Sequence, residues 1–300
     1  MLKKLKDIEL PRKEEGEFDH GDVHAQSGRV FVANTAAGTV EVIDGVRLEH
    51  IATLEGCPEA SGVLCAADEE MIFAASRATG RVLVIEPDSL ETVLVLEAGS
   101  SPNGIAWDSS RKNVAVADVK DNSLRLFKPR SISPISTFSL PGRPRWCAYD
   151  KERDRFLVNI REPAGVCAVN TGKNGALSQA GFITISGKGP HGLAIDAASH
   201  RGFVACDSAE LVTFDLRSGA ELTKMKIAGA PDVIWFNPVS NELYCAIGEK
   251  GTIQVIDAAG MKIAQELQTE RGAHTFAFDE TRQKLYAFLP SSCKARVFSC

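Results

Sequence analysis

Related segments recur along the chain, and each carries one side chain that is able to do chemistry. The segment "GPHGLAID" at 189–196 contains His191, and the residue in its place changes from copy to copy. The clearest relatives are "SPNGIAWD" at 101–108, "RPRWCAYD" at 143–150, "APDVIWFN" at 230–237 and "GAHTFAFD" at 272–279, with divergent copies near 18–26 and 57–68. Aligned on the Pro-x-Gly pattern, the residues at this place are His20, Glu59, Asn103, Arg145, His191, Asp232 and His274.

Three of the six histidines of the chain fall at this one place. Imidazole nitrogens and carboxylate oxygens that converge on one point suit a divalent metal such as zinc, manganese, iron or calcium. The metal ligands that we predict are His20, Glu59, His191 and His274. Such a metal polarises a carbonyl group or lowers the pKa of a bound water, with a neighbouring His or Asp as general base. No motif indicates an organic cofactor.

The remaining residues at this place favour an anionic ligand. A guanidinium such as that of Arg145 holds a carboxylate or a phosphate through paired hydrogen bonds. Arg161, in a nearby turn that we expect on the same face, adds a second positive charge, and Arg77 and Asp207 lie in equivalent turns. The predicted ligand-binding residues are Asn103, Arg145, Arg161 and Asp232. The alternative is that these residues form a polar, solvated mouth in which histidines cap turns or bind water.

The first copy contains a second candidate motif, "HGDVH", in which His20, Asp22 and His24 share one face if the chain is extended. Same-face neighbours on a strand are roughly 6.6–6.8 Å apart, too far for joint ligation of one metal without a bend. We therefore expect His24 to take the turn-making place that Asp108 and Asp150 occupy in other copies. Asp19 is an alternative to His20 at the repeated place.

A repeat of about 43 residues must position these side chains. Gly ends a polar turn at positions 56, 99, 142, 187, 229 and 272. Each unit then contains four short runs rich in β-branched residues, separated by turn residues, as in "DKERDR" and "DETRQK". Four-stranded units at this spacing predict an all-β, seven-bladed β-propeller that occupies residues 1–300 as one domain.

The last unit, 273–300, supplies only three strands. We expect residues near 5–10 to pair beside "ARVFSC" as its fourth strand and so to close the ring, since an open blade exposes a strand edge. A short helix over residues 1–10 is the alternative, because Leu2, Leu5 and Ile8 are spaced by three.

Two stretches resemble a known repeat. "GRVFVANTAAGTVEVIDG" at 28–45, with Phe31-Val32-Ala33-Asn34, and "ELYCAIGEKGTIQVID" at 242–257 resemble the YVTN repeat. The "GPHGLAID" and "SPNGIAWD" segments resemble repeats of NHL-type and virginiamycin-lyase-type propellers. This resemblance covers the whole chain and implies the propeller fold, but one scaffold hosts lactonases, lyases and plain binding modules. Lactonase-like or lyase chemistry on an axial metal is what it implies for function.

Composition argues against some other functions. The formal net charge is −5 and no run of Lys or Arg exceeds two, which does not favour nucleic acid as a partner. No apolar run is long enough to cross a bilayer. The eight cysteines sit mostly in apolar runs and read as small buried side chains in a reducing compartment, so we expect a cytoplasmic protein. The sequence thus predicts a hydrolase or lyase for a small anionic molecule, or else a non-catalytic propeller that binds a ligand or a partner protein.

Overall fold

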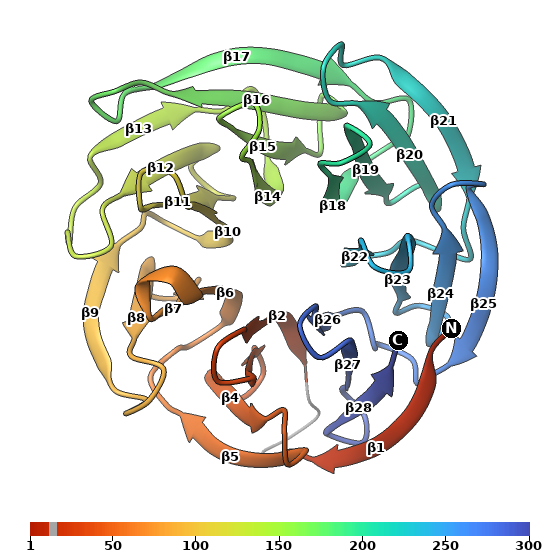
Figure 1. Ribbon diagram of the computed structural model, residues 1–300. Coiled ribbons are helices and arrows are strands. Elements are labelled where there is room, and N and C mark those ends of the chain that lie inside the picture. The colour runs from red at the N-terminus through yellow and green to blue at the C-terminus, as the bar shows by residue number, and fades with distance from the viewer. Residues whose placement is uncertain (12–16) are drawn as a thin grey trace.

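The computed structural model of the protein describes residues 1–11 and 17–300. Over this part of the chain the strands form seven four-stranded antiparallel sheets. The sheets stand as blades around a central axis, with the first strand of each unit innermost (Figure 1). This confirms the all-β, seven-bladed propeller that the 43-residue repeat predicts.

The blades are numbered in chain order, and blade 7 contains both ends of the chain. Blade 1 contains β2 (Phe18–His24), β3 (Arg29–Asn34), β4 (Thr39–Asp44) and β5 (Glu49–Leu54). Blade 2 contains β6 (Ala60–Ala66), β7 (Met71–Ser76), β8 (Arg81–Ile85) and β9 (Thr92–Glu97). Blade 3 contains β10 (Pro102–Asp108), β11 (Asn113–Asp118), β12 (Ser123–Phe127) and β13 (Ser136–Ser139). Blades 4 and 5 are β14 (Pro144–Asp150), β15 (Arg155–Ile160), β16 (Gly165–Thr171), β17 (Leu177–Thr184); and β18 (Pro190–Asp196), β19 (Arg201–Cys206), β20 (Glu210–Asp215), β21 (Glu221–Lys226). Blades 6 and 7 are β22 (Ile234–Asn237), β23 (Glu242–Ile247), β24 (Thr252–Asp257), β25 (Lys262–Gln268); and β26 (Phe276–Asp279), β27 (Lys284–Leu289), β28 (Lys294–Ser299), β1 (Lys3–Glu9). A short 3-10 helix, η1 (Ala67–Glu69), follows β6.

Burial explains why these runs become strands of a propeller. The second strand of each blade is apolar on both faces, as in β7, where every residue is buried. The fourth strand lies on the outside and is largely exposed, as in β21. The core divides into seven apolar clusters, each of which joins neighbouring blades. Removal of these side chains from water stabilises the ring. All eight cysteines are free thiols, buried or half-buried in this packing.

The N-terminal segment closes the ring as a strand, as the sequence predicts, and not as a helix. β1 pairs with β28 in antiparallel register from Lys3 opposite Ser299 to Glu9 opposite Lys294. Asp7 accepts two hydrogen bonds from the Arg296 guanidinium, at 2.9 and 3.1 Å. The buried Leu2 then continues to blade 6, where its backbone exchanges two hydrogen bonds with the Gln265 side chain. Both ends of the chain are therefore held by neighbours.

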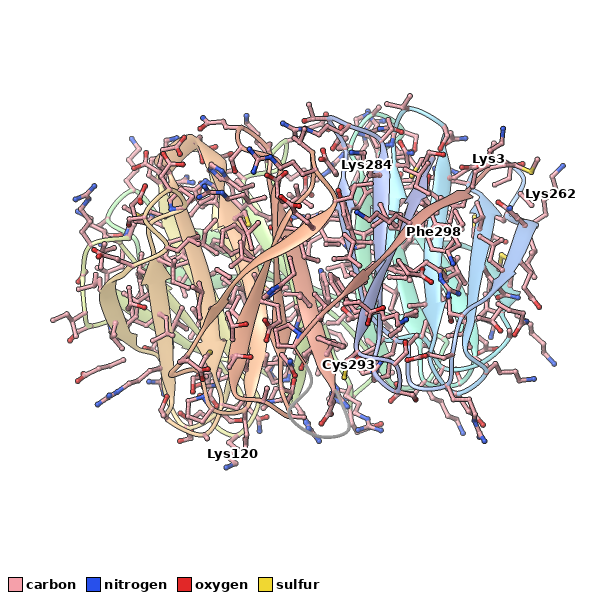
Figure 2. The ribbon with its side chains drawn as sticks, turned by 90° about the horizontal axis from the view of Figure 1, so that it is seen from below. Lys3, Lys120, Lys262, Lys284, Cys293 and Phe298 are labelled. Carbon is pink, nitrogen blue, oxygen red and sulfur yellow. The ribbon has the colours of Figure 1, made fainter. Side chains whose placement is uncertain are left out.

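The ring has two faces. The start face is the side on which the innermost strands begin, and it carries the second-to-third strand turns that contain Lys120 and Cys293. The end face is the side on which the innermost strands end, near Lys284 and Lys262. Figure 2 shows these two pairs at opposite edges of the ring.

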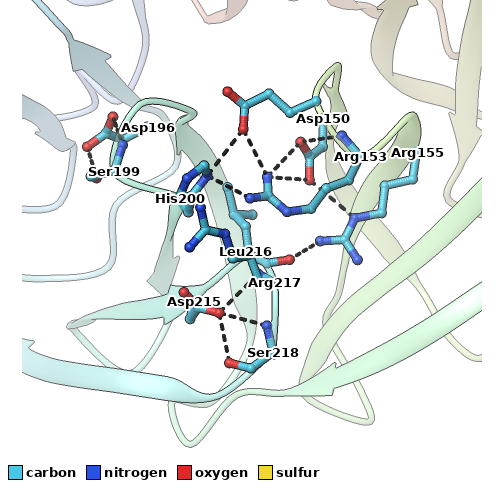
Figure 3. Close-up of polar contacts among 11 residues, drawn as sticks. Asp150, Arg153, Arg155, Asp196, Ser199, His200, Asp215, Leu216, Arg217 and Ser218 are labelled. Atoms are coloured by element: carbon cyan, nitrogen blue, oxygen red, sulfur yellow. Dashed lines mark hydrogen bonds and ion pairs between the residues drawn. The ribbon is translucent and has the colours of Figure 1, made fainter.

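A repeated contact holds neighbouring blades together on the end face. The first residue of the second strand reaches across and donates to a carbonyl in the third-to-fourth strand turn of the next blade. The pairs are Arg29 with Pro87, Arg155 with Leu216, Arg201 with Ala258, and Lys284 with Gly45. Figure 3 shows the pair between blades 4 and 5, where Asp150 also fixes Arg155 and Arg153 reaches His200. We call this contact the blade latch.

Among the described residues, no helix is both long enough and apolar enough to cross a membrane.

Candidate functional site

Strand register decides which side chains occupy equivalent places at the start of the innermost strands. In blades 1 to 5 the first residue of the innermost strand pairs with the last residue of the second, as Pro190 does with Cys206. A register shift follows this pair in each of the five blades. We call the residue directly after the first residue of the innermost strand, such as His191 in blade 5, the ring position of its blade. The equivalent residues are Asp19, Ser61, Asn103, Arg145, His191, Asp232 and His274.

Five of the seven predicted ring positions are therefore confirmed as equivalent, and two are corrected. In blade 1 the equivalent residue is Asp19, the alternative left open above, and His20 follows it. In blade 2 it is Ser61, because Ala60 pairs with Ser76. Glu59 is exposed, has a φ of 51°, and meets Arg77 only through its own backbone carbonyl. No other described residue forms a hydrogen bond or ion pair with the Glu59 side chain.

The Pro-x-Gly pattern itself has a packing role. A Cβ at Gly62 would lie 1.8 Å from the carbonyl oxygen of Asn103 in the next blade. At Gly104 and Gly192 the corresponding distances to the next blade are 2.6 and 2.8 Å. Glycine at this position lets successive innermost strands approach closely and so brings the ring residues together around the axis.

Blades 5 to 7 bring together a histidine held between two carboxylates. The Nδ1 atom of His191 lies 3.2 Å from Oδ1 of Asp207, on a second-to-third strand turn, and its Nε2 contacts Asp232. Nε2 of His274 lies 3.5 Å from the other oxygen of Asp232. Burial acts to lower the pKa of His191, but the two carboxylates outweigh it and raise this pKa to about 9. His191 is therefore protonated at neutral pH.

Blades 1 and 2 provide a second charged group beside the first. Nδ1 of His20 lies 2.8 Å from Oδ1 of Asp19, and the guanidinium of Arg77 lies 3.4 Å from the other oxygen. Burial opposes protonation of His20, but Asp19 and then Asp232 raise its pKa above the usual value. Asp232 is thus shared electrostatically by histidines of three blades, which hold its pKa low against the effect of burial.

The two predicted arginines lie at this same mouth. Arg161 forms an ion pair with Asp207, with 3.0 Å between Nη2 and Oδ2. Arg145 differs, since no ion pair involves it among the described residues and its buried Nε atom has no hydrogen-bond partner there. Burial, then the nearby Arg143, lowers the pKa of Arg145, while Asp232 acts against this change. Asn103 beside it likewise has a buried, unpartnered Oδ1. Buried polar atoms normally have a hydrogen-bond partner, so the donor on Arg145 and the acceptor on Asn103 suit a polar ligand at this place.

We call the charged residues at the axis on the start face the axial cluster. Its members are Asp19, His20, Arg77, Arg145, Arg161, His191, Asp207, Asp232 and His274. Three arginines offset three aspartates, so the proton on His191 leaves the axial cluster with an excess of positive charge. The sequence alone identified all nine residues, but not the pairing of His191 with Asp207.

The predicted metal ligands are not assembled as one set. His20 is engaged with Asp19, Glu59 stands apart, and Nδ1 of His274 contacts the carbonyl oxygen of Gly272 at 2.7 Å. Within residues 1–11 and 17–300, no three His, Cys, Asp or Glu side chains are arranged to hold a metal ion. The nearest approach to a ligand set is the pair of Nε2 atoms, from His191 and His274, that face Asp232.

A cavity along the axis, which we call the axial cavity, begins next to the axial cluster at His20. The His20 ring packs against Trp146 from the far side of the ring, with 4.5 Å between ring centroids. Beyond this contact a cavity of about 890 Å³ follows the axis toward the end face. His20 therefore belongs to both regions, with its charge in the axial cluster and its ring at the floor of the cavity.

No family model matches the chain, and no curated protein matches it. The fold and site define a seven-bladed β-propeller with a charged axial cluster, and the function must be argued from that site.

Proposed function

We propose that the protein binds a small anionic molecule, with a carboxylate as its anionic group, at the axial cluster. The observation that carries this proposal is Arg145, a half-buried guanidinium at the axis without an ion pair among the described residues. A guanidinium that is removed from water and left unpaired is costly, and a bound carboxylate satisfies it through two hydrogen bonds. The proton on His191 adds to the attraction.

The chemistry that fits this arrangement is that of a hydrolase or lyase. His191 keeps its proton at neutral pH, because Asp207 and Asp232 flank it. An anion paired with Arg145 lies beside this imidazolium, whose positive charge stabilises negative charge that develops on an oxygen of the bound molecule. Asp207 and Asp232 orient the ring and stabilise its charge.

We propose only one arrangement of residues that could hold a divalent metal at the axial cluster. His191, His274 and Asp232 are the residues that would hold it, since both imidazole Nε2 atoms face the same carboxylate. A metal there would compete with the proton on His191. Metal analysis of the purified protein without a His-tag, before and after addition of zinc, manganese or calcium, tests this arrangement. Less than about a tenth of an equivalent, unchanged by addition, would remove it.

The anion proposal is tested by calorimetric titration with acetate, succinate, citrate and inorganic phosphate. Arg145→Gln should weaken binding by at least about tenfold, because a charge-assisted pair is lost. Arg143→Gln is the matched control, since Arg143 lies two residues away and is exposed. Equal binding by the wild type and Arg145→Gln would sink the proposal. If none of these anions binds, the alternative of a non-catalytic propeller that binds another ligand or a partner protein is favoured.

A further inference from the structure

The axial cavity lies apart from the axial cluster, with which it shares only His20. Its walls come from the innermost strands of all seven blades, and it extends from His20 to the end-face turns at Ala197 and Pro238. Its volume of about 890 Å³ lies in the range of sites that enclose a small molecule. The walls are mostly apolar, with Leu64, Ile105 and Leu193 among them.

Six aromatic side chains line the axial cavity. They are Trp107, Trp146, Trp235, Tyr149, Phe236 and Phe278. Trp146 and Trp235 meet edge to face, with ring centroids 6.4 Å apart. Aromatic faces attract cations through the ring quadrupole, tryptophan most strongly.

The charges around the axial cavity are of one sign, apart from His20. No Lys or Arg lines it among the described residues, whereas Asp22, Asp196, Asp279 and Glu280 do. Asp196 and Asp279 are held by arginines of their own turns, Arg201 at 3.1 Å and Arg282 at 3.3 Å. These two carboxylates are therefore already neutralised.

Asp22 is different. Its two oxygens accept hydrogen bonds from the backbone N–H groups of Val23, at 2.7 Å, and Cys65, at 2.8 Å. No described cationic side chain forms an ion pair with it. Burial raises its pKa to about 6, against the effect of the two hydrogen bonds. At neutral pH the cavity wall therefore holds a carboxylate with no counter-ion among the described residues.

Register shows that Asp22 departs from the repeat. Its equivalents in blades 2 to 7 are Leu64, Ala106, Ala148, Ala194, Trp235 and Ala277. Each of these is apolar, so the propeller does not need a carboxylate at this position. A buried charge that packing does not require is a candidate for ligand recognition.

From these observations we infer that the axial cavity binds an organic cation, an ammonium group on an aromatic or branched apolar body, with Asp22 as its counter-ion. The ammonium satisfies the Asp22 carboxylate, and the apolar body fills the aromatic walls. This inference is independent of the anion proposal, since it concerns the other side of the contact between His20 and Trp146.

The three tryptophans of the chain all line the axial cavity, so tryptophan fluorescence reports directly on its occupancy. The probes are 2-phenylethylamine, the neutral 2-phenylethanol and the anionic 3-phenylpropanoate. We expect the amine to bind at least about tenfold more tightly than the alcohol at neutral pH, and the anion to bind least. Equal binding of amine and alcohol, or no response to the amine at millimolar concentrations, would overturn the inference.

Variants locate the effect. Asp22→Asn should remove the preference for amine over alcohol, while Asp88→Asn, an exposed carboxylate of blade 2, should keep it. Ala148→Phe should block all three probes by filling the axial cavity. An amine preference that survives in either Asp22→Asn or Ala148→Phe contradicts the assignment.

The pH dependence of the wild type gives a test that does not rely on a folded variant. The preference for amine over alcohol should rise as pH increases through about 6, since Asp22 ionises there. The other titratable groups around the axial cavity are His20, Cys65, Tyr149, Asp196, Asp279 and Glu280. The pKa of His20 is raised above its usual value, burial and Asp22 raise the pKa of the Cys65 thiol, and Asp196 and Asp279 form ion pairs with arginines. A flat preference across this range would contradict the role of Asp22.

Discussion

The axial cluster and the axial cavity share one axis but handle charge in opposite ways. The axial cluster gathers cations and anions, and its carboxylates hold protons on histidines, with His191 at a pKa of about 9. The axial cavity keeps one carboxylate, Asp22, without a described counter-ion among aromatic walls. Burial is common to both regions, so the presence or absence of a partner decides the sign of each pKa shift. A propeller axis can therefore present two chemically distinct regions, one toward each face.

The largest expected effect concerns the close packing of neighbouring innermost strands at Gly62. Gly62→Ala should reduce the free energy of unfolding by about 3 kcal/mol or more, because its Cβ would meet the Asn103 carbonyl oxygen at 1.8 Å. Gly181→Ala is the matched control, since a Cβ there meets nothing within 4 Å, and it should change stability little. Urea denaturation measures both variants. If the two variants lose similar stability, the packing of blade 2 against blade 3 does not require the close approach of their innermost strands at Gly62.

The axial cluster should make stability depend on pH on the alkaline side. The folded pKa of His191, about 9, exceeds its ordinary value of 6.5. Its contribution is thus complete below about 6.5 and is lost as pH rises through about 9. We expect the wild type to lose about 2–3 kcal/mol over this range, and His191→Gln to lose much less. Denaturant titrations across the range check this, and parallel curves would refute the pairing of His191 with the two aspartates.

The axial cavity should give a pH dependence on the acid side. The folded pKa of Asp22, about 6, exceeds its ordinary value of 3.8, so the folded state binds the proton more tightly. Stability from this group is present below about 3.8 and is lost as pH rises through about 6. Relative to the wild type, Asp22→Asn should gain about 2 kcal/mol between these limits, measured by urea denaturation. No relative gain would mean that Asp22 already has a counter-ion.

The smallest expected effect concerns the blade latch, which lies outside both regions. Lys284→Met removes the hydrogen bond from Lys284 to the Gly45 carbonyl, and should reduce the free energy of unfolding by about 1 kcal/mol. Lys173→Met, at an exposed turn position of blade 4, should be neutral. Thermal denaturation compares the two. Anion and amine binding should be unchanged in both variants, and a loss of binding would show that the blade latch shapes the axis.

The sequence predicted the fold closely because the repeat is local. Each run of four strands is written within about 43 residues, and Gly punctuates the units, so strand order and ring closure follow without any knowledge of distant contacts. Arg145, His191, Asp232 and His274 were placed correctly for the same reason, since the Pro-x-Gly pattern or its variants mark their register.

The position of Glu59 and the existence of the axial cavity could not be predicted from the sequence. The segment "CPEASG" offers two polar residues for one position, and only the pairing of Ala60 with Ser76 selects Ser61. The three tryptophans occupy three different register positions in blades 3, 4 and 6, so no periodic pattern marks their convergence. Asp22 was noticed only as part of "HGDVH", where nothing showed its burial or its lack of a described counter-ion.

By itself, the sequence determined the blades, their number and the side chains that each presents at the start of its innermost strand, because these depend on short-range patterning. Only the tertiary structure decided which side chains meet across the axis. Those encounters, such as His20 with Trp146 or His191 with Asp207, depend on strand register and on the approach of blades that are distant in sequence. Charge partners and burial arise from these encounters, and they set the protonation states on which both proposed sites depend.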